Sequence, residues 1–166
     1  MRIAESLIGE LEREARSTVR MLERVPADRL EWKPHEKSMS IGQLAWHIST
    51  LPRSGVLGLK EKKREVGLSR PAPRTGDDLV GTFTTCVAEL KAALTATSDA
   101  TLLTERFSFE RNGEKVASFP LIGFIQTVIL NHSIHHRGQL SVYLRLLNIP
   151  VPAMYGTSAD ESVFER

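Results

Sequence analysis

The stretch FPLIGFIQTVILNHSIHHRGQLSVYLRLL, residues 119–147, decides the fold that this sequence predicts. Apolar side chains recur through it at spacings of three and four, which is typical of an amphipathic helix. Ser118 can cap this helix, and Pro120 lies in its first turn, where proline is tolerated. Pro150 stops the helical pattern. The stripe expected to face the core comprises Leu121, Ile125, Val128, His132, His136, Leu140, Tyr143 and Leu147.

Three more helices are predicted upstream of this stretch. Residues 3–24 repeat apolar side chains with the same spacing. A second helix is expected over 40–64, because Ser40 is a good N-cap and Gln43 follows three residues later, as in a capping box. A third is expected over 77–97, where two aspartates open the helix and complement its dipole. The proline-containing segments 26–38 and 66–76 are expected to be loops.

Residues 105–118 break the helical pattern. Phe107-Ser108-Phe109 alternates apolar and polar side chains, and Asn112-Gly113 is a type I′ turn signal. We expect a small β-hairpin or an ordered loop here. The sequence therefore predicts an all-α fold, a four-helix bundle with a small hairpin or loop excursion before the last helix, in a single domain over residues 1–166.

Composition excludes several classes of protein. Of 166 residues 41% are hydrophobic and 25% charged, and the net charge is only +2, far from that of a dedicated nucleic-acid binder. We find no apolar run of signal-peptide or membrane-span length, so we expect no membrane and a cytoplasmic location. The single cysteine, Cys86, excludes an internal disulfide and lies on the apolar stripe of the third helix, which indicates a packing role.

A basic run covers residues 60–74. It holds six cationic side chains against two glutamates, Glu61 and Glu65, and could attract an anionic thiol or a nucleic acid. Such a run is more often a solvated helix end, and no aromatic residues alternate with it as in single-strand binders. The six are Lys60, Lys62, Lys63, Arg64, Arg70 and Arg74.

Three of the five histidines crowd into Asn131-His132-Ser133-Ile134-His135-His136. His132 can project beside either His135 or His136, because residues three or four apart share a helix face. The apolar stripe includes His136 and leaves His135 on a flank. Two imidazoles four residues apart can chelate one metal ion, as in the zinc motif H-E-x-x-H. Ser133 replaces the glutamate of that motif, so a zinc protease is rejected.

His47 is the best candidate for a third ligand. It lies on the second helix between Leu44, Ile48 and Leu51, where a histidine must be hydrogen-bonded, metal-bound or partly hydrated. Three histidine ligands from two helices would leave at least one coordination position open, which points to catalysis or substrate binding. A hydrogen-bonded core histidine stays an alternative. His35 follows Pro34 among charged residues and is expected to be exposed.

Three neighbours of the histidines keep two interpretations each. Arg137 and Gln139 could orient ligands or close the helix packing, or could be a surface arginine and an ordinary helix residue. Trp46 could form the wall of a pocket or pack between helices, and we favour packing because aromatic side chains dominate core burial.

Two separated blocks resemble the motifs of the DinB/YfiT-like family. They are His132–Leu140, HSIHHRGQL, and Ser40–Ile48, SIGQLAWHI, with Trp32–Pro34 similar to the connecting loop of that family. The resemblance implies a four-helix bundle and a divalent metal ion, zinc or nickel, bound by one histidine of the second helix and two of the last. Those residues here are His47, His132 and His136. It also implies a homodimer.

The resemblance carries an expectation about function. The wider group includes bacillithiol S-transferases and the mycothiol-dependent maleylpyruvate isomerase. It therefore implies a metal-dependent transferase that activates a low-molecular-weight thiol for attack on a small electrophile, since a coordinated thiol has a lowered pKa. The alternative is a non-catalytic metal- or ligand-binding stress-response protein. A nucleic-acid-associated damage-response protein is a weaker third.

Overall fold

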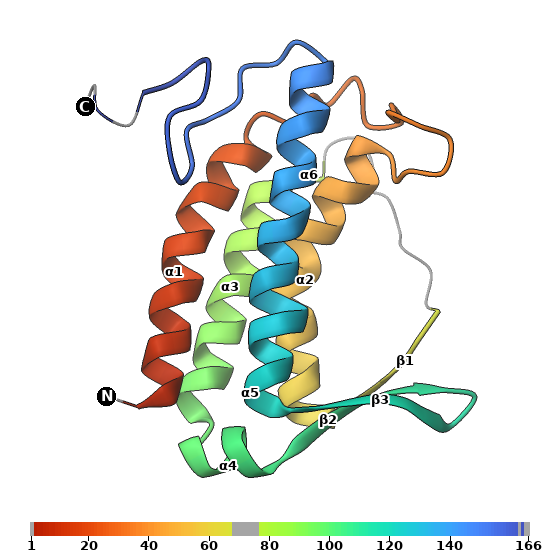
Figure 1. The fold of residues 1–166 in the computed structure, drawn as a ribbon, viewed down its shortest axis with the longest axis vertical. Helices are drawn as coiled ribbons and strands as arrows, with labels where there is room; N and C mark the ends of the chain where they lie inside the picture. Colours follow the sequence, from red (N-terminus) through yellow and green to blue (C-terminus); the bar gives the residue numbers. More distant parts are fainter. Residues whose placement is uncertain (1, 68–76, 163, 165–166) are drawn as a thin grey trace.

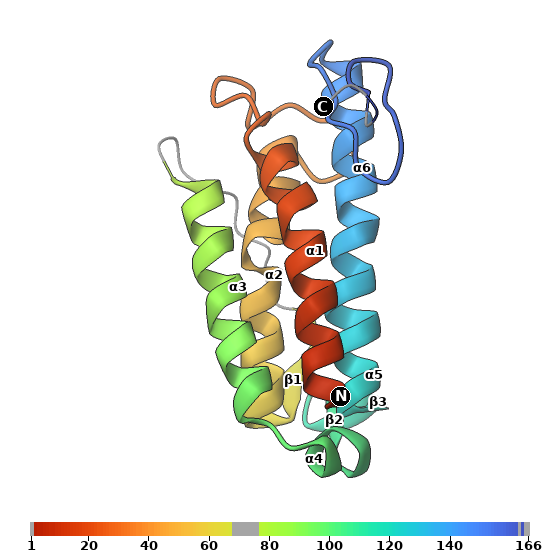
Figure 2. The same cartoon turned by 90° about the vertical axis from the view of Figure 1, so that its left-hand side faces the viewer.

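Three long helices and one composite helical segment run side by side along the molecule (Figure 1, Figure 2). The computed structural model describes residues 2–67, 77–162 and 164. The helices are α1 (Ile3–Leu22), α2 (Ile41–Glu61) and α3 (Leu79–Ala96), and the composite segment consists of α5 (Leu121–Gly123), η1 (Phe124–Asn131) and α6 (His132–Leu146). The predicted helical fold is confirmed in its main elements. A short helix that the sequence analysis missed, α4 (Asp99–Thr104), follows α3.

The local signals at the helix starts act as predicted. The backbone N–H of Gln43 donates to Ser40 Oγ at 3.1 Å, and the N–H of Ser40 donates to Gln43 Oε1 at 3.0 Å, which completes the capping box of α2. Asp78 caps α3 by accepting the N–H of Gly81 at 2.8 Å. The predicted loop over 66–76 lies outside the described residues from residue 68 onward, and so do Arg70 and Arg74 of the basic run.

The composite segment differs from the single regular helix predicted over 119–147. It starts at Leu121, because Ser118 is paired in a β-strand and caps nothing. Residues 124–131 form π-helical hydrogen bonds, which join residues five apart. Phe124 and Ile129 are accordingly both buried, and so are Ile125 and Leu130. A π-helix has more residues per turn than an α-helix. The stripe predicted with 3.6 residues per turn therefore did not include Phe124, Ile129 and Leu130, which are buried.

A three-stranded sheet makes the all-α prediction wrong. It contains β1 (Lys63–Glu65), β2 (Arg106–Arg111) and β3 (Glu114–Pro120), in the order β1-β2-β3. The predicted hairpin is β2–β3, antiparallel, and its turn has positive φ at Asn112 (54°) and Gly113 (80°), as type I′ requires. β1 pairs parallel with β2, Arg64 opposite Phe109. The sheet lies at the end of the bundle where α1 begins (Figure 1).

Two apolar clusters fill the bundle. One is built around residues such as Leu90, Phe107 and Phe124, and includes the side chains of α5 and η1. The other is built around residues such as Ile48 and Leu140. α2 contributes buried residues to both clusters, and so does the composite segment, through η1 to the first and through α6 to the second.

The third helix is the one described helix that is long and apolar enough to cross a membrane. It has 18 residues, a mean hydropathy of 1.2 and a buried share of 22%. Helices in the cores of soluble proteins pass the same test, and the buried residues of α3, Phe83, Cys86, Leu90 and Leu94, recur at spacings of three and four. The helix is therefore weak evidence for a membrane. The predicted burial of Cys86 is confirmed.

Candidate metal centre

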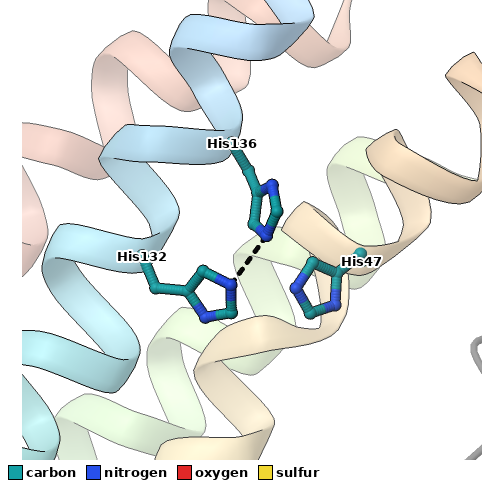
Figure 3. Close-up of side chains that lie close together, drawn as sticks. All are labelled: His47, His132 and His136. Atoms are coloured by element: carbon teal, nitrogen blue, oxygen red, sulfur yellow. Dashed lines mark hydrogen bonds between the residues drawn. The ribbon is translucent and has the colours of Figure 1, made fainter. Parts of the chain in front are cut away.

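Three histidines from two helices converge inside the bundle (Figure 3). His47 comes from α2, and His132 and His136 come from the first turn and a half of α6. Each offers one ring nitrogen, and these atoms all lie within 4.8 Å of one another. The structure thus brings together the three residues singled out from the sequence. That they bind a metal stays a prediction.

The other two histidines lie outside this cluster. His135 is exposed on the flank of α6, as the stripe predicted, with its ring centroid 5.1 Å from that of His136. His35 is exposed on the loop before α2. A metal site in the described part of the chain that contained either residue would need a different set of ligands.

Hydrogen bonds orient the two rings of α6. Nδ1 of His132 lies 3.2 Å from the carbonyl oxygen of Val128. Because a carbonyl oxygen only accepts, this nitrogen carries the hydrogen and Nε2 keeps its lone pair. Nδ1 of His136 lies 2.6 Å from Gln139 Oε1, again an acceptor, so His136 takes the same tautomer. Both Nε2 atoms therefore present lone pairs.

The two Nε2 atoms lie 2.7 Å apart, at the hydrogen-bond distance drawn in Figure 3. Two such atoms repel unless a proton or a metal cation lies against them. His136 is only 5% exposed, and the ring of His47 approaches both others, with centroids 4.6 Å from His136 and 5.1 Å from His132. Three converging imidazoles, two of them oriented by these hydrogen bonds, are a donor set that suits a divalent transition metal. The residues present therefore fit the ion that the resemblance implies.

Gln139 and Arg137 take different roles. Gln139 orients His136, which is one of the two interpretations left open by the sequence. Arg137 is not a surface residue: it is 1% exposed and its Nη2 lies 2.5 Å from the carboxylate of Glu14 on α1. Its Nη1 donates to Thr18 Oγ1 at 3.1 Å, and Nη2 also donates to the hydroxyl of Tyr155. Arg137 thus connects α6 with α1 and with the C-terminal tail, the segment that follows α6.

A cavity of about 350 Å³ opens beside the histidines. His47 and His132 line it, and so does Arg64 of β1. Trp46 is half-buried and forms part of the wall, so the preference for simple packing was wrong. The sequence of β1, Lys-Arg-Glu, lacks the alternation of apolar and polar residues that is typical of a strand. The sequence analysis therefore did not predict that β1 contributes to the wall of the cavity.

The one thiol of the chain takes no part in this site. Cys86 is fully buried on α3 and does not line the cavity. Burial raises the pKa of its thiol, which disfavours the reactive thiolate. A sulfur nucleophile at the histidines would have to come from a bound molecule.

Comparison with known proteins places the chain in a family. The model of the DinB superfamily matches residues 10–140, a range that includes all three clustered histidines. The protein YrdA of Bacillus subtilis strain 168 is 25% identical over 154 residues, which cover 89% of this chain and 85% of YrdA.

Two solved structures are similar over nearly the whole chain. A DinB-like protein from Bacillus cereus ATCC 10987 superposes with a TM-score of 0.69 at 25% identity, over 91% of this chain and 97% of that one. The DinB-like protein YjoA from Bacillus subtilis superposes with a TM-score of 0.67 at 22% identity, over 89% and 96%. The fold, the paired motifs and the extent of the family match lead to one conclusion: the chain belongs to the DinB superfamily.

Proposed function

We propose that this protein is a metal-dependent transferase that activates a low-molecular-weight thiol for attack on a small electrophile. The observation that carries the proposal is the convergence of three imidazole nitrogens, within 4.8 Å of one another, beside a cavity of about 350 Å³ whose lining includes His47 and His132. A site buried for purely structural reasons would not need a cavity at its side. A cavity gives a second molecule access to the site.

The donor set is compatible with a divalent transition metal. Three neutral imidazoles suit zinc or nickel, and three protein ligands leave at least one coordination position for a substrate. A divalent ion at this position would lower the pKa of a thiol that reaches it, so that the sulfur reacts as a thiolate. The ion would serve as a Lewis acid only, because the proposed reaction exchanges no electrons with it.

The residues of the chain perform the remaining tasks. His47, His132 and His136 would hold the ion, and Gln139 would keep the ring of His136 in the ligating tautomer. Apolar walls that include Phe124 and Val128 exclude water from the reacting atoms. The thiol gives its proton to solvent, a sulfur–carbon bond forms, and the leaving group departs from the electrophile with its electron pair. Atoms and charges balance without an added oxidant.

Metal content tests the ligand assignment. We expect the wild-type protein to retain about one zinc or nickel ion per chain after dialysis, in line with a three-histidine site. The variants His47→Ala and His136→Ala should retain none. His135→Ala is the matched control, because it removes an exposed imidazole next to the site and should leave the metal content unchanged. Equal metal content in His136→Ala and wild type, by plasma mass spectrometry, would refute the assignment.

Product analysis tests the reaction. The zinc-loaded and nickel-loaded proteins are incubated with bacillithiol, mycothiol, glutathione or cysteine, and with monochlorobimane as the electrophile. We expect at least one thiol to form a thioether faster than it does without protein. This acceleration should be lost in His47→Ala. If metal binds but no thiol reacts or binds, the protein is instead the non-catalytic metal- or ligand-binding protein of the alternative hypothesis.

A further inference from the structure

The cavity beside the histidines has a cationic group in its lining that the metal centre does not use. Arg64 belongs to β1, which pairs parallel with β2 and so lies against the hairpin. Its neighbour on the strand, Lys63, lies outside the lining, and the Nζ atom of Lys63 is 3.6 Å from the carboxylate of Glu110. Arg64 pairs with Phe109, which also lines the cavity, and its guanidinium is hydrogen-bonded to Ser54 of the same lining.

The guanidinium of Arg64 uses few of its hydrogen-bond donors within the protein. Nη1 of Arg64 donates to Ser54 Oγ at 3.0 Å. Within the residues that the structure describes, no carboxylate lies within ion-pair distance of Arg64. Glu65 also lines the cavity, but its Oε1 accepts the backbone N–H of Asn112 at 2.5 Å, which draws the carboxylate toward the hairpin turn. An arginine has five N–H donors, so most of those on Arg64 remain for an incoming acceptor.

Ser54 strengthens the site as a second donor. Its oxygen accepts the bond from Arg64, which leaves the hydroxyl hydrogen for another acceptor. Ser54 is half-buried on α2, two turns after His47, and lines the same cavity. A planar guanidinium beside a hydroxyl matches the two oxygens of a carboxylate, which bind such a fork through parallel hydrogen bonds.

Most of the remaining lining is apolar, although Thr50 and Glu65 also belong to it. Trp46, Leu51, Phe124 and Val128 contribute apolar side chains to it. The volume of about 350 Å³ is near the lower end of the ~300–1,000 Å³ typical of small-molecule sites. The cavity therefore suits one small molecule with an apolar body and polar ends, and does not suit a polymer.

We propose that Arg64 and Ser54 bind the carboxylate of a substrate whose apolar body fills the cavity and whose other end reaches the histidines. The proposal rests on the proposed function for what happens at that other end, but the binding of the carboxylate can be measured without it. The substrate class is accordingly a small, carboxylate-bearing molecule with an aliphatic or aromatic body.

Calorimetric titration with a matched pair of probes tests this site. The probes are 4-phenylbutyrate and 4-phenylbutanol, which share the apolar body and differ in the carboxylate. Each is titrated into zinc-loaded protein and into protein freed of metal with a chelator. We expect Arg64→Met to weaken 4-phenylbutyrate binding about tenfold in both forms and to remove its preference over the alcohol. 4-Phenylbutanol should bind the wild type and Arg64→Met alike.

Two further variants make the result specific. Lys63→Met removes the same charge from the adjacent strand position and should bind the carboxylate as the wild type does, because Lys63 is outside the lining. Arg64→Lys keeps the charge but loses the fork, and should give an intermediate affinity. Circular dichroism checks that each variant is folded, which we expect because Arg64 is exposed.

The outcomes separate this proposal from the proposed function. Equal losses in Lys63→Met and Arg64→Met, unchanged binding in Arg64→Met, or no binding of 4-phenylbutyrate to the wild type at millimolar concentration would each overturn the carboxylate site. Arg64-dependent binding in the metal-free protein supports the site even if no thiol is transferred. Thiol transfer without a role for Arg64 would instead leave the function standing and this inference refuted.

Discussion

At the scale of single residues, one turn of α6 carries three different tasks. His136 faces the candidate metal centre, Arg137 points into the contact with α1, and Gln139 returns to the ring of His136. Successive helical residues point about 100° apart, so neighbours in sequence reach different surroundings. The side chain of Gln139 touches no ion in this arrangement and acts through His136, which makes it a positioning residue.

We predict that Gln139→Leu weakens zinc binding by about 10–100-fold, since loss of the acceptor leaves the tautomer and ring angle of His136 free. Competition with a chromophoric chelator measures the affinity. Gln126→Leu, an exposed glutamine on η1, is the matched control and should bind zinc like the wild type. Rescue by Gln139→Glu, which keeps an acceptor at this position, would support the hydrogen bond as the cause. Equal affinities in both leucine variants would contradict it.

Arg137 should matter more for stability than any exposed arginine. In Arg137→Met the carboxylate of Glu14, 15% exposed, loses its cationic partner, and the hydroxyl of Thr18 loses one of its hydrogen bonds. Removing one member of a buried ion pair costs about 3 kcal/mol or more, so the free energy of unfolding should fall by about that amount. Urea denaturation measures it. Arg145→Met, on the same helix but exposed, should cause a smaller loss, and equal losses would contradict the argument.

At the scale of elements, the close approach of α2 and η1 shapes the wall of the cavity. Gly58 of α2 is buried, and a Cβ atom there would collide with the ring of Phe124 on η1. That ring cannot move aside, because it stacks on Phe107 at 3.9 Å between centroids and is 2% exposed. The π-helical turn of η1 and the absence of a side chain at residue 58 therefore act together to allow the close approach of the two helices.

We predict opposite effects of alanine at two helical glycines. Gly58→Ala should lower the free energy of unfolding by about 1–3 kcal/mol, because the added methyl group overpacks the contact with Phe124. Gly138→Ala should raise it by about 0.5–1 kcal/mol, since nothing lies within 4 Å of the new methyl group and alanine favours the helix. Thermal and urea unfolding compare the two. A stabilised Gly58→Ala variant would show that α2 and η1 are packed less closely.

At the scale of the whole molecule, hydrogen bonds and ion pairs hold the C-terminal tail against α1 and α6. Arg20 of α1 donates to the carbonyl oxygen of Ala153 at 2.7 Å. Asp160 accepts from Arg145 of α6 at 2.5 Å and from the N–H of Val151 at 2.8 Å. Tyr155 reaches the buried pair of Arg137 and Glu14. The tail thus covers the end of the bundle opposite the sheet (Figure 1).

The tail should loosen in acid because of Asp160. Hydrogen bonds from Arg145 and from the backbone N–H of Val151 hold the pKa of the Asp160 carboxyl below its ordinary 3.8. A folded-state pKa below the unfolded one adds stability above the unfolded value, and this stability is lost as pH falls through the folded pKa. Hydrogen-exchange protection of the Val151 amide should therefore fall below about pH 4.

The variant Asp160→Asn separates this effect from general acid unfolding. Protection of the Val151 amide should already be reduced at neutral pH in Asp160→Asn. Asp28→Asn, which removes an exposed carboxylate from the loop after α1, should behave like the wild type. Protection that is equal in all three proteins at every pH would show that Asp160 does not hold the tail.

The homodimer that the family resemblance implies stays a prediction. Light scattering in solution should give twice the 18.5 kDa mass of the chain. A mass of one chain would refute it. Neither result alters the metal centre, because the three histidines come from a single chain.

The sequence by itself determined the features that depend on near neighbours. Helical periodicity, the Ser40–Gln43 capping box and the Asn112-Gly113 turn are contacts between residues a few positions apart, so pattern and propensity predict them. The pair His132 and His136 is equally local, because four residues make about one helical turn. The third histidine was already less certain: its position on an apolar stripe allowed a ligand or a hydrogen-bonded core residue.

Only the tertiary structure decided what distant residues do together. β1 is a strand because β2, more than forty residues later, pairs with it, and its three exposed residues carry no pattern of their own. The burial of Arg137 depends on α1, and the place of Trp46 and Arg64 in one cavity depends on helix and sheet meeting. The physical reason is common to all of these: a side chain takes its role from the groups that surround it, and those groups come from parts of the chain that only folding brings together.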